Sequence, residues 1–341
     1  MKKTTLLFLL WALIVPFTLS AQDKATPRKG EGIIAFLERN NRDFGRDYQA
    51  FKELNKGKFD KNGNLMLGVE YKLPPTDGSK PAGKPASTKG EKKKEPLFGK
   101  KYEDYTVETN KLKGATYFIV AGHGGPDCGT TANVEGHVLH EDEYNYDVAL
   151  RLARCLLQEG ATVHIIIQDK NDGIRDDRFL KNSNTETCMG KAIPLNQKER
   201  LQQRSDKITE LSKKSKDTYQ RSIFVHIDYR DNEKTQLDPY VFYHKKCIDG
   251  KKLAENIRAM MEKKYEEVQK GRGYNGSIIE KDLHVLRNTE VPGAYVELGN
   301  MMNKLDQQRI IVPGNRQALA KWITLALIKD FEDSKKEEKK K

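Results

Sequence analysis

Hydrophobic and polar positions follow two alternating periods along most of this chain. Short apolar runs of the kind that form buried strands occur at 118–121, 162–167, 222–228, 240–244, 283–287 and 294–298. Apolar residues recur at helical spacing between and after these runs, over 141–155, 196–214, 253–268 and 317–331. Strands that alternate with helices predict an α/β fold in which a mostly parallel sheet carries helices on both faces.

The stretch 116–152 holds the first chemical signal. Its apolar run ends in Gly-His-Gly-Gly at 122–125, a turn so poor in side chains that it indicates close approach of the backbone to another group. His123 therefore stands at the carboxyl end of a strand, where open α/β sheets place their sites.

The helix that follows has an apolar stripe formed by Tyr144, Val148, Leu152 and Cys155. Extending this stripe back by three positions reaches Glu141, so this carboxylate starts the core-facing side. The other charged positions are expected on the solvent side of the helix: Glu143, Asp147, Arg151 and Arg154. A histidine at a strand end and a glutamate at a neighbouring helix start are two parts of a metal site. A core histidine and a solvated glutamate are the alternative interpretation.

Two more strand ends carry polar groups. The run 223–228 ends with His226 and Asp228, and Glu297 lies in the apolar run 292–299, where a carboxylate without a role would be costly. Catalytic zinc typically has three protein ligands, His mixed with carboxylate, and a fourth position for water. Hydrolysis then needs an unbound carboxylate that takes a proton from the water and gives it to the leaving amine. The residues at these element ends satisfy both requirements.

The first 21 residues have the pattern of an export signal. Lys2 and Lys3 precede an apolar stretch over 6–19, and small residues before Gln22 form a cleavage site. A transmembrane anchor is the alternative, but Pro16 interrupts a run that is short for a bilayer. We therefore expect an exported protein, in the periplasm, the cell envelope or the extracellular space, with no transmembrane segment after the signal is removed.

Composition divides the remaining chain into four parts. Residues 28–75 predict a small α+β module, and residues 76–112, rich in Lys, Pro and Gly, predict a basic flexible linker. The catalytic domain is expected over 113–332 and a charged tail over 333–341. The polar segment 168–195 is too long for a plain connection and is interpreted as a surface insertion near the site.

The formal charge is +12. For an exported protein this basic balance favours an anionic cell envelope over nucleic acid as partner. The four cysteines permit disulfides whose pairing the sequence does not determine: Cys128, Cys155, Cys188 and Cys247.

Residues 115–331 resemble the zinc-dependent N-acetylmuramoyl-L-alanine amidases. The segments that carry the resemblance are GHGGPDCG, EDEYNYDVALRLA, NQKERLQQRSD, FVHID and LHVLRNTEVPGAYVELGNMMN. The resemblance implies a phosphorylase/hydrolase-like fold, zinc (Zn2+) held by His123, Glu141 and His226, and Glu297 as the catalytic acid and base. Residues 28–75 resemble a lysin motif, a module that binds the glycan of cell walls; an ordinary helical spacer is the alternative.

The chain departs from the amidase pattern at Val120, Cys128 and Asn300. None of the three changes removes an implied ligand. Cys128 also allows a Cys–His hydrolase with His123 as base, although this leaves both glutamates unexplained. A serine esterase is excluded because no G-x-S-x-G segment occurs.

Several polar residues have more than one interpretation. Asp228 competes with His226 as third ligand, since residues two apart on a strand share a face; a neutral imidazole leaves the ion more charge to acidify water, which favours His226. His137 and His140 are further candidate ligands near Glu141. Arg287 and Asn288 could bind the carboxylate or amide groups of a muropeptide, or make surface contacts.

The predicted function is a secreted zinc hydrolase that cleaves the amide between N-acetylmuramic acid and L-alanine in peptidoglycan. The alternatives are a non-catalytic wall-binding protein on an amidase fold, and a zinc peptidase that cuts elsewhere in the stem peptide. Peptidoglycan is the expected partner, and the sequence identifies no activator protein.

Overall fold

A computed structural model describes residues 23–28, 31–40, 42, 44–60, 64–75, 90–232, 234–269 and 271–338. The expected export signal over 1–21 lies outside these residues, and so do residues 76–89 of the expected linker. Within the described part of the chain, no helix combines the length and the apolar character that crossing a bilayer needs.

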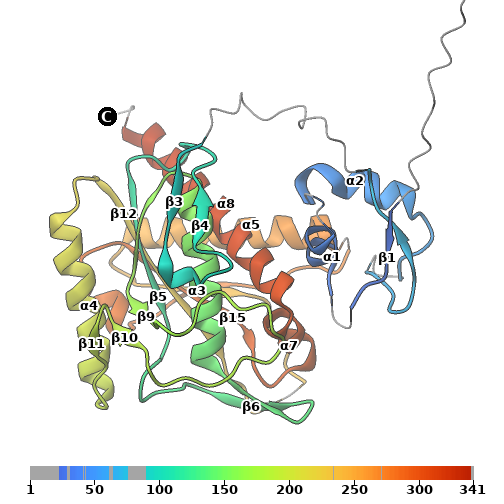
Figure 1. Ribbon diagram of the computed structural model, residues 1–341. Coiled ribbons are helices and arrows are strands. Elements are labelled where there is room, and N and C mark those ends of the chain that lie inside the picture. The colour runs from blue at the N-terminus through green and yellow to red at the C-terminus, as the bar shows by residue number, and fades with distance from the viewer. Residues whose placement is uncertain are drawn as a thin grey trace, which may run out of the picture.

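A six-stranded sheet forms the centre of the larger domain (Figure 1), in the order β14-β13-β15-β12-β5-β8. All neighbouring strands are parallel except β13 and β15. The strands are β5 (Ala115–Ala121), β8 (Thr162–Ile165), β12 (Tyr219–Asp228), β13 (Tyr240–Tyr243), β14 (Ile278–Glu280) and β15 (Gly293–Asn300). The central strands β5 and β12 are almost wholly buried, as their continuous apolar runs predict.

Helices cover both faces of this sheet. They are α3 (Glu141–Gln158), α4 (Gln197–Lys214), α5 (Ile248–Val268), α6 (His284–Arg287), α7 (Lys304–Ile311) and α8 (Pro313–Glu338). Neighbouring side chains of β5 show the two faces: Tyr117 donates to the carbonyl of Leu327 in α8, whereas Thr116 contacts Ser215 directly after α4. Since successive strand residues point to opposite faces, α8 and α4 lie on opposite sides. The predicted α/β fold is therefore confirmed.

The first described residues form a separate small unit with its own apolar core. It contains β1 (Lys24–Ala25), α1 (Ile33–Arg39), α2 (Phe44–Leu54) and β2 (Tyr71–Lys72), with β1 and β2 antiparallel. Its core is formed by Ile33, Phe36, Leu37, Phe51, Tyr71 and Leu73. This unit lies beside the larger domain, where α1 packs on α8 and the Tyr48 hydroxyl donates to the carbonyl of Glu267 over 2.7 Å (Figure 1).

The structure corrects the boundaries of the predicted linker. Residues 90–112 do not form a flexible tether but a hairpin of β3 (Lys92–Lys94) and β4 (Asp104–Thr106), with the short helix η1 (Pro96–Phe98) between them. The lysines of β3 are exposed, so the segment lacks an apolar period. Phe98, Tyr105 and Leu112 nevertheless join the core of the larger domain.

One other segment differs from the prediction. Residues 283–287 were predicted as a strand but form the single turn α6, in which the amide of Asn288 donates to the carbonyl of His284. Buried Val285 and Leu286 give this turn its apolar signal. The expected tail is helical as far as Glu338, and Asp333 pairs there with Lys329 and Lys336.

The segment 168–195 runs over α3 as a mostly irregular surface layer. It contributes the short strands β9 (Ile167–Gln168), β10 (Thr187–Cys188) and β11 (Lys191–Ala192) to a small sheet of their own. A second hairpin, of β6 (Thr131–Val134) and β7 (His137–His140), leads into α3.

This layer buries the side of α3 that was predicted to face solvent. Asp147 is fully buried between Arg151 and Arg316, at 2.7 Å and 2.5 Å, and its Oδ1 accepts from the amide of Arg175. The arginine partners outweigh the cost of burial and lower the pKa of Asp147 to about 2. The solvent-facing prediction was wrong because both the insertion and α8 cover the helix.

Candidate metal centre

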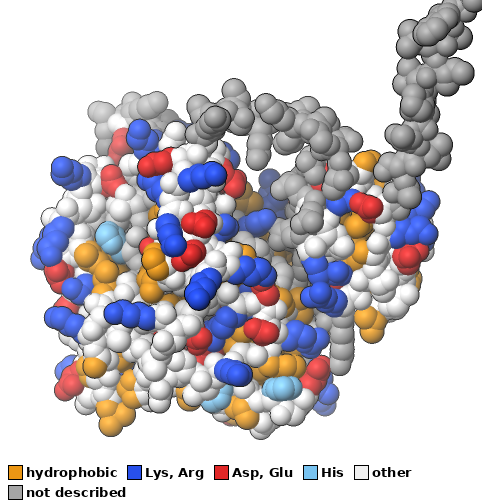
Figure 2. All heavy atoms as spheres, viewed as in Figure 1, with side chains coloured by type: hydrophobic (Ala, Val, Ile, Leu, Met, Phe, Trp, Pro, Cys, Tyr) orange, Lys and Arg blue, Asp and Glu red, His pale blue; other side chains and the backbone are white. Residues whose placement is uncertain are grey.

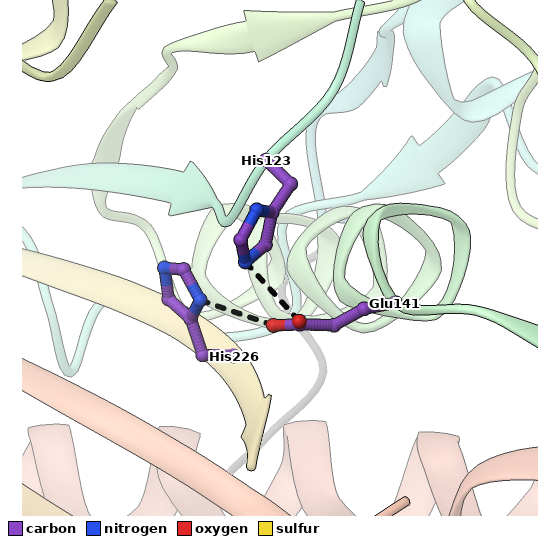
Figure 3. Close-up of side chains that lie close together, drawn as sticks. All are labelled: His123, Glu141 and His226. Carbon is purple, nitrogen blue, oxygen red and sulfur yellow. Dashed lines mark hydrogen bonds and ion pairs between the residues drawn. The ribbon is translucent and has the colours of Figure 1, made fainter. Parts of the chain in front are cut away.

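Three side chains from three different elements converge at one edge of the sheet (Figure 3). His123 follows β5, Glu141 is the first residue of α3, and His226 lies near the end of β12. One possible ligand atom from each lies within 4.8 Å of the other two. The structure thus brings together the three residues that the sequence predicted as ligands.

Glu141 is the centre of this group, and only 3% of its surface is exposed. Its Oε2 lies 3.1 Å from His123 Nε2, and its Oε1 lies 3.1 Å from His226 Nδ1 (Figure 3). The backbone amides of Thr130 and Ile227 also donate to the carboxylate. Burial raises the pKa of Glu141, but the hydrogen bonds with His123 and His226 outweigh it and hold the pKa well below its usual value.

The pKa values of the two imidazoles are shifted in opposite directions. Burial lowers the pKa of His226 to about 4. Burial also acts to lower the pKa of His123, but Asp127 and Glu141 outweigh it and raise the pKa to about 10. The group therefore holds its proton on His123, between two carboxylates, and a bound cation would displace that proton because metal ligation needs a neutral imidazole.

Two glycines leave the room that the ligand atoms occupy. A Cβ atom on Gly122 would lie 2.2 Å from the ring of His226. A Cβ atom on Gly129 would lie 2.7 Å from Glu141 Oε2 and 2.8 Å from His123 Cδ2. The side-chain-poor turn predicted from the sequence is thus explained by the close approach of the ligand side chains.

Outer contacts fix the orientation of His123. Its φ of 62° lies in the left-handed region, which is unusual for a residue with a Cβ atom, and buried Arg204 in α4 donates to its carbonyl oxygen. Its Nδ1 lies 2.9 Å from Asp127 Oδ2, and Arg200 donates to the same oxygen over 2.7 Å. A carboxylate on the far nitrogen of a histidine is the usual arrangement behind a metal ligand.

Glu297 lies beside this group on β15. The parallel register pairs it with His226, and Tyr295 on the same strand stacks on the His226 ring at 4.2 Å between centroids. Only 8% of Glu297 is exposed, and its Oε2 has no hydrogen-bond partner among the described residues. Burial raises the pKa of Glu297 well above its usual value, and the nearby carboxylates Glu141 and Asp228 add to this.

Asp228, the competing third ligand, lies outside the group. Its Oδ2 accepts from the hydroxyl of Tyr240 over 2.6 Å and from Arg230 over 2.8 Å. These partners hold the Asp228 carboxylate outside the group of candidate ligands. His226, rather than Asp228, occupies the position beside Glu141.

The two predicted substrate-binding residues are not part of the group either. Arg287 pairs with Asp282 over 2.7 Å, with both side chains largely exposed, and Asn288 donates to the carbonyl of His284. In this structure both make local contacts around α6.

The other candidate residues near Glu141 have separate surroundings. His137 stacks on Phe179 at 3.9 Å, and His140 immediately precedes α3 without joining the group. Burial raises the pKa of the Cys128 thiol, and Asp142 and Asp127 raise it further, which disfavours the thiolate that a Cys–His hydrolase would need. The four cysteines are all free.

The donor set agrees with a catalytic zinc site. Two imidazoles and one carboxylate are a ligand combination of zinc hydrolases, in which water takes the fourth position. A sequence profile described as N-acetylmuramoyl-L-alanine amidase matches residues 118–329, which contain all three converging side chains and Glu297. The chain belongs to the N-acetylmuramoyl-L-alanine amidase family.

Individual relatives of this amidase-family chain are distant. A probable cell wall amidase of Staphylococcus aureus, LytH, is 26% identical over 220 residues, which are 64% of this chain and 60% of the relative. An N-acetylmuramoyl-L-alanine amidase from Clostridium difficile 630 shares 22% identity at a TM-score of 0.46, covering 65% of this chain and 98% of that one. The CwlD amidase from Clostridioides difficile, solved in complex with the GerS lipoprotein, shares 19% identity at a TM-score of 0.46, covering 64% of this chain and 98% of that one.

The amidase-family domain also contains a second group of carboxylates that sequence reasoning missed. Asp142, Glu143 and Glu186 are all buried and bring oxygen atoms within 4.8 Å of one another. Burial raises the pKa of Asp142 to about 8, with Glu143 and Glu186 adding to the shift. The signal in the sequence was the run Glu-Asp-Glu at 141–143, but helical periodicity assigned its last member to solvent.

Proposed function

We propose that this chain is an exported zinc hydrolase that cleaves the amide between N-acetylmuramic acid and L-alanine in peptidoglycan. The observation that supports this most directly is the convergence of His123, Glu141 and His226 beside Glu297, inside the segment that matches the amidase family. Glu297 is buried, and its Oε2 has no hydrogen-bond partner in the described part of the chain. The sequence match spans about 60% of the curated relative's length, so activity and substrate are inferred from the site rather than from the relative.

His123, Glu141 and His226 would hold the zinc ion. When bound, zinc would polarise the amide carbonyl and lower the pKa of a water molecule. Asp127 and Arg200 would keep His123 oriented from behind, and stacking by Tyr295 would keep His226 in place.

Glu297 would move the proton. Burial raises its pKa, which favours acceptance of a proton, and a cation bound beside it would lower that pKa and favour the ionised form at the start of the reaction. Glu297 would then accept the proton of the attacking water and pass it to the amine of L-alanine as the amide bond breaks.

Digestion of purified peptidoglycan tests this function. With zinc, we expect mass spectrometry to find stem peptides with a free amino-terminal L-alanine and glycan strands with intact lactyl groups. A chelator should abolish these products, and added zinc should restore them. New amino termini elsewhere in the peptide would indicate the zinc peptidase, and binding without products at saturating zinc would indicate the non-catalytic alternative.

Arg287 and Asn288 would contact the carboxylate and amide groups of the stem peptide. Arg287 would have to exchange its pairing with Asp282 for the substrate, which costs little because exposed ion pairs are weak. An unchanged KM for peptidoglycan in Arg287→Ala would show that Arg287 does not contact the substrate.

The amino-terminal unit would bind the same polymer. Its two helices and two paired strands support the predicted resemblance to a lysin motif, and Lys and Arg side chains are spread over the visible face of both the unit and the larger domain (Figure 2). The unit has its own apolar core, formed by residues between Ile33 and Leu73, so we expect a fragment of residues 22–75 to sediment with insoluble peptidoglycan. If the fragment stays wholly in the supernatant at moderate salt, the proposal is wrong.

A further inference from the structure

The second carboxylate group lies at the start of α3, next to the proposed zinc ligands but separate from them. Asp142 and Glu143 belong to the first turn of α3, and Glu186 comes from the 168–195 segment. Their exposed fractions are only 2%, 1% and 5%. Three acidic side chains are therefore held together out of contact with bulk water.

Each carboxylate has one oxygen fixed by a backbone amide. Asp142 Oδ1 accepts from the amide of Glu143, Glu143 Oε1 from that of Ser183, and Glu186 Oε2 from that of Gly125. These donors come from three segments and hold the carboxylates rigidly.

Positive charge does not balance the group. Arg175 is the single basic side chain that pairs with it among the described residues, at 2.9 Å from Glu143 Oε2, and Arg175 also pairs with Asp172 at 3.1 Å. Asp142 Oδ2 is buried and has no hydrogen-bond partner among those residues. Burying an unpaired carboxylate oxygen in the presence of two further acids is costly unless a cation or a proton compensates it.

We infer that Asp142, Glu143 and Glu186 form a second metal site, for a hard divalent cation such as Ca²⁺. The ligand set consists of oxygen atoms alone, which calcium prefers, whereas protein zinc sites usually include nitrogen or sulfur ligands. The buried Asp142 Oδ2, which has no hydrogen-bond partner among the described residues, supports a bound cation independently of the clustering of the acids.

This cation would join three parts of the domain. Glu186 accepts from the amide of Gly125, two residues from His123, so the site would tie the 168–195 segment to both the glycine turn and the first turn of α3. Glu141 belongs to that same turn. The second metal would thereby hold the segments that carry two of the proposed zinc ligands.

Thermal unfolding of the full chain in calcium-free buffer with one equivalent of zinc tests the inference. Addition of CaCl2 to about 100 times its Kd should raise the Tm by about 3–5 °C. Isothermal titration should give one calcium per chain. The readout needs neither activity nor peptidoglycan, so it is independent of the proposed function.

Variants locate the site. Asp142→Asn and Glu186→Gln should lose the calcium-dependent rise in Tm, whereas the control Glu255→Gln, an exposed acid on α5, should keep all of it. In calcium-free buffer Asp142→Asn should melt at a higher temperature than the wild type, because its buried amide, unlike a buried carboxyl group, needs neither a cation nor a proton to compensate a charge. This provides a second readout in case one variant folds poorly.

Three results would overturn the inference. One is a wild type that shows no calcium-dependent shift at millimolar CaCl2, which would mean that a shared proton compensates the group. Another is an equal calcium shift in wild type and both variants, which would place the ion elsewhere. The third is tight binding of a second zinc ion in preference to calcium.

Discussion

Two groups of side chains share the first turn of α3 and have opposite electrostatics: Glu141 lies with two histidines, whereas Asp142 and Glu143 lie with Glu186. Glu141 is surrounded by donors, and the pKa of its carboxyl is held well below the usual value. Asp142 is the next residue, and burial beside two other acids raises its pKa to about 8. Two adjacent residues therefore differ in what they bind. Glu141 is an ionised carboxylate among nitrogen donors, whereas Asp142 needs a proton or a hard cation. The contrast shows that partners, rather than burial alone, set the charge of these groups.

The largest expected effect removes a nitrogen ligand from the first group. His226→Ala should lose zinc, measured by metal analysis after dialysis, with a drop in affinity well beyond the roughly 100-fold that loss of an outer contact costs. Asp228→Asn is the matched control, since it alters the same strand end but leaves the group intact, and it should retain zinc. Zinc lost from Asp228→Asn and kept in His226→Ala would reverse the assignment of the third ligand.

The next effect separates proton transfer from metal binding. Glu297→Gln keeps the shape of the side chain but cannot accept a proton, so the rate of peptidoglycan hydrolysis should fall by about 10²–10⁴-fold. Zinc content should stay at one per chain. A variant that loses its zinc as well would show that Glu297 is a ligand.

A third experiment tests the second group through pH. The pKa of Asp142 is raised from 3.8 to about 8 in the folded state, so its contribution to stability is present in full below about pH 3.8 and is lost as the pH rises through about 8. In calcium-free buffer, Asp142→Asn should therefore gain stability relative to the wild type between pH 4 and 9, by up to about 5 kcal/mol for the full shift. Urea unfolding at several pH values measures this difference. A difference that does not change with pH would show that Asp142 is already ionised at pH 4.

The smallest effect concerns the contact behind His123. Asp127→Asn keeps the side chain in place but removes the charge that holds the imidazole, so zinc affinity should fall by about 10–100-fold. Competition with a chromophoric chelator measures this affinity. A loss as complete as that of His226→Ala would mean that Asp127 itself binds the metal.

The sequence predicted the parts of this site that follow a regular period. The apolar runs located β5, β12 and β15, and the stripe of α3 placed Glu141 on the core side. Because the carboxyl ends of the parallel strands β5 and β12 meet at one edge of the sheet, His123 and His226 could be expected together before their contact was seen.

The parts that were missed depend on covering layers that have no period. Glu143 and Asp147 lie on the polar side of α3 and are buried only because the irregular segment 168–195 and α8 fold over them. The hairpin of β3 and β4 escaped notice because exposed lysines form its first strand. Specific polar contacts hold such irregular segments in place, and the period of apolar residues does not predict these contacts.

The space that Gly122 leaves for His226 has a consequence for how inactive relatives are recognised. An added methyl group there would lie 2.2 Å from the imidazole, and His226 could keep its position only if the backbone moved. A chain with alanine at this position would still contain every ligand and the acid–base residue, and a survey of those residues would count it as an enzyme. Loss of function in this fold can thus arise at a position that has no functional group, so degenerate wall-binding descendants should be sought among changes of such glycines as well as among changes of ligands.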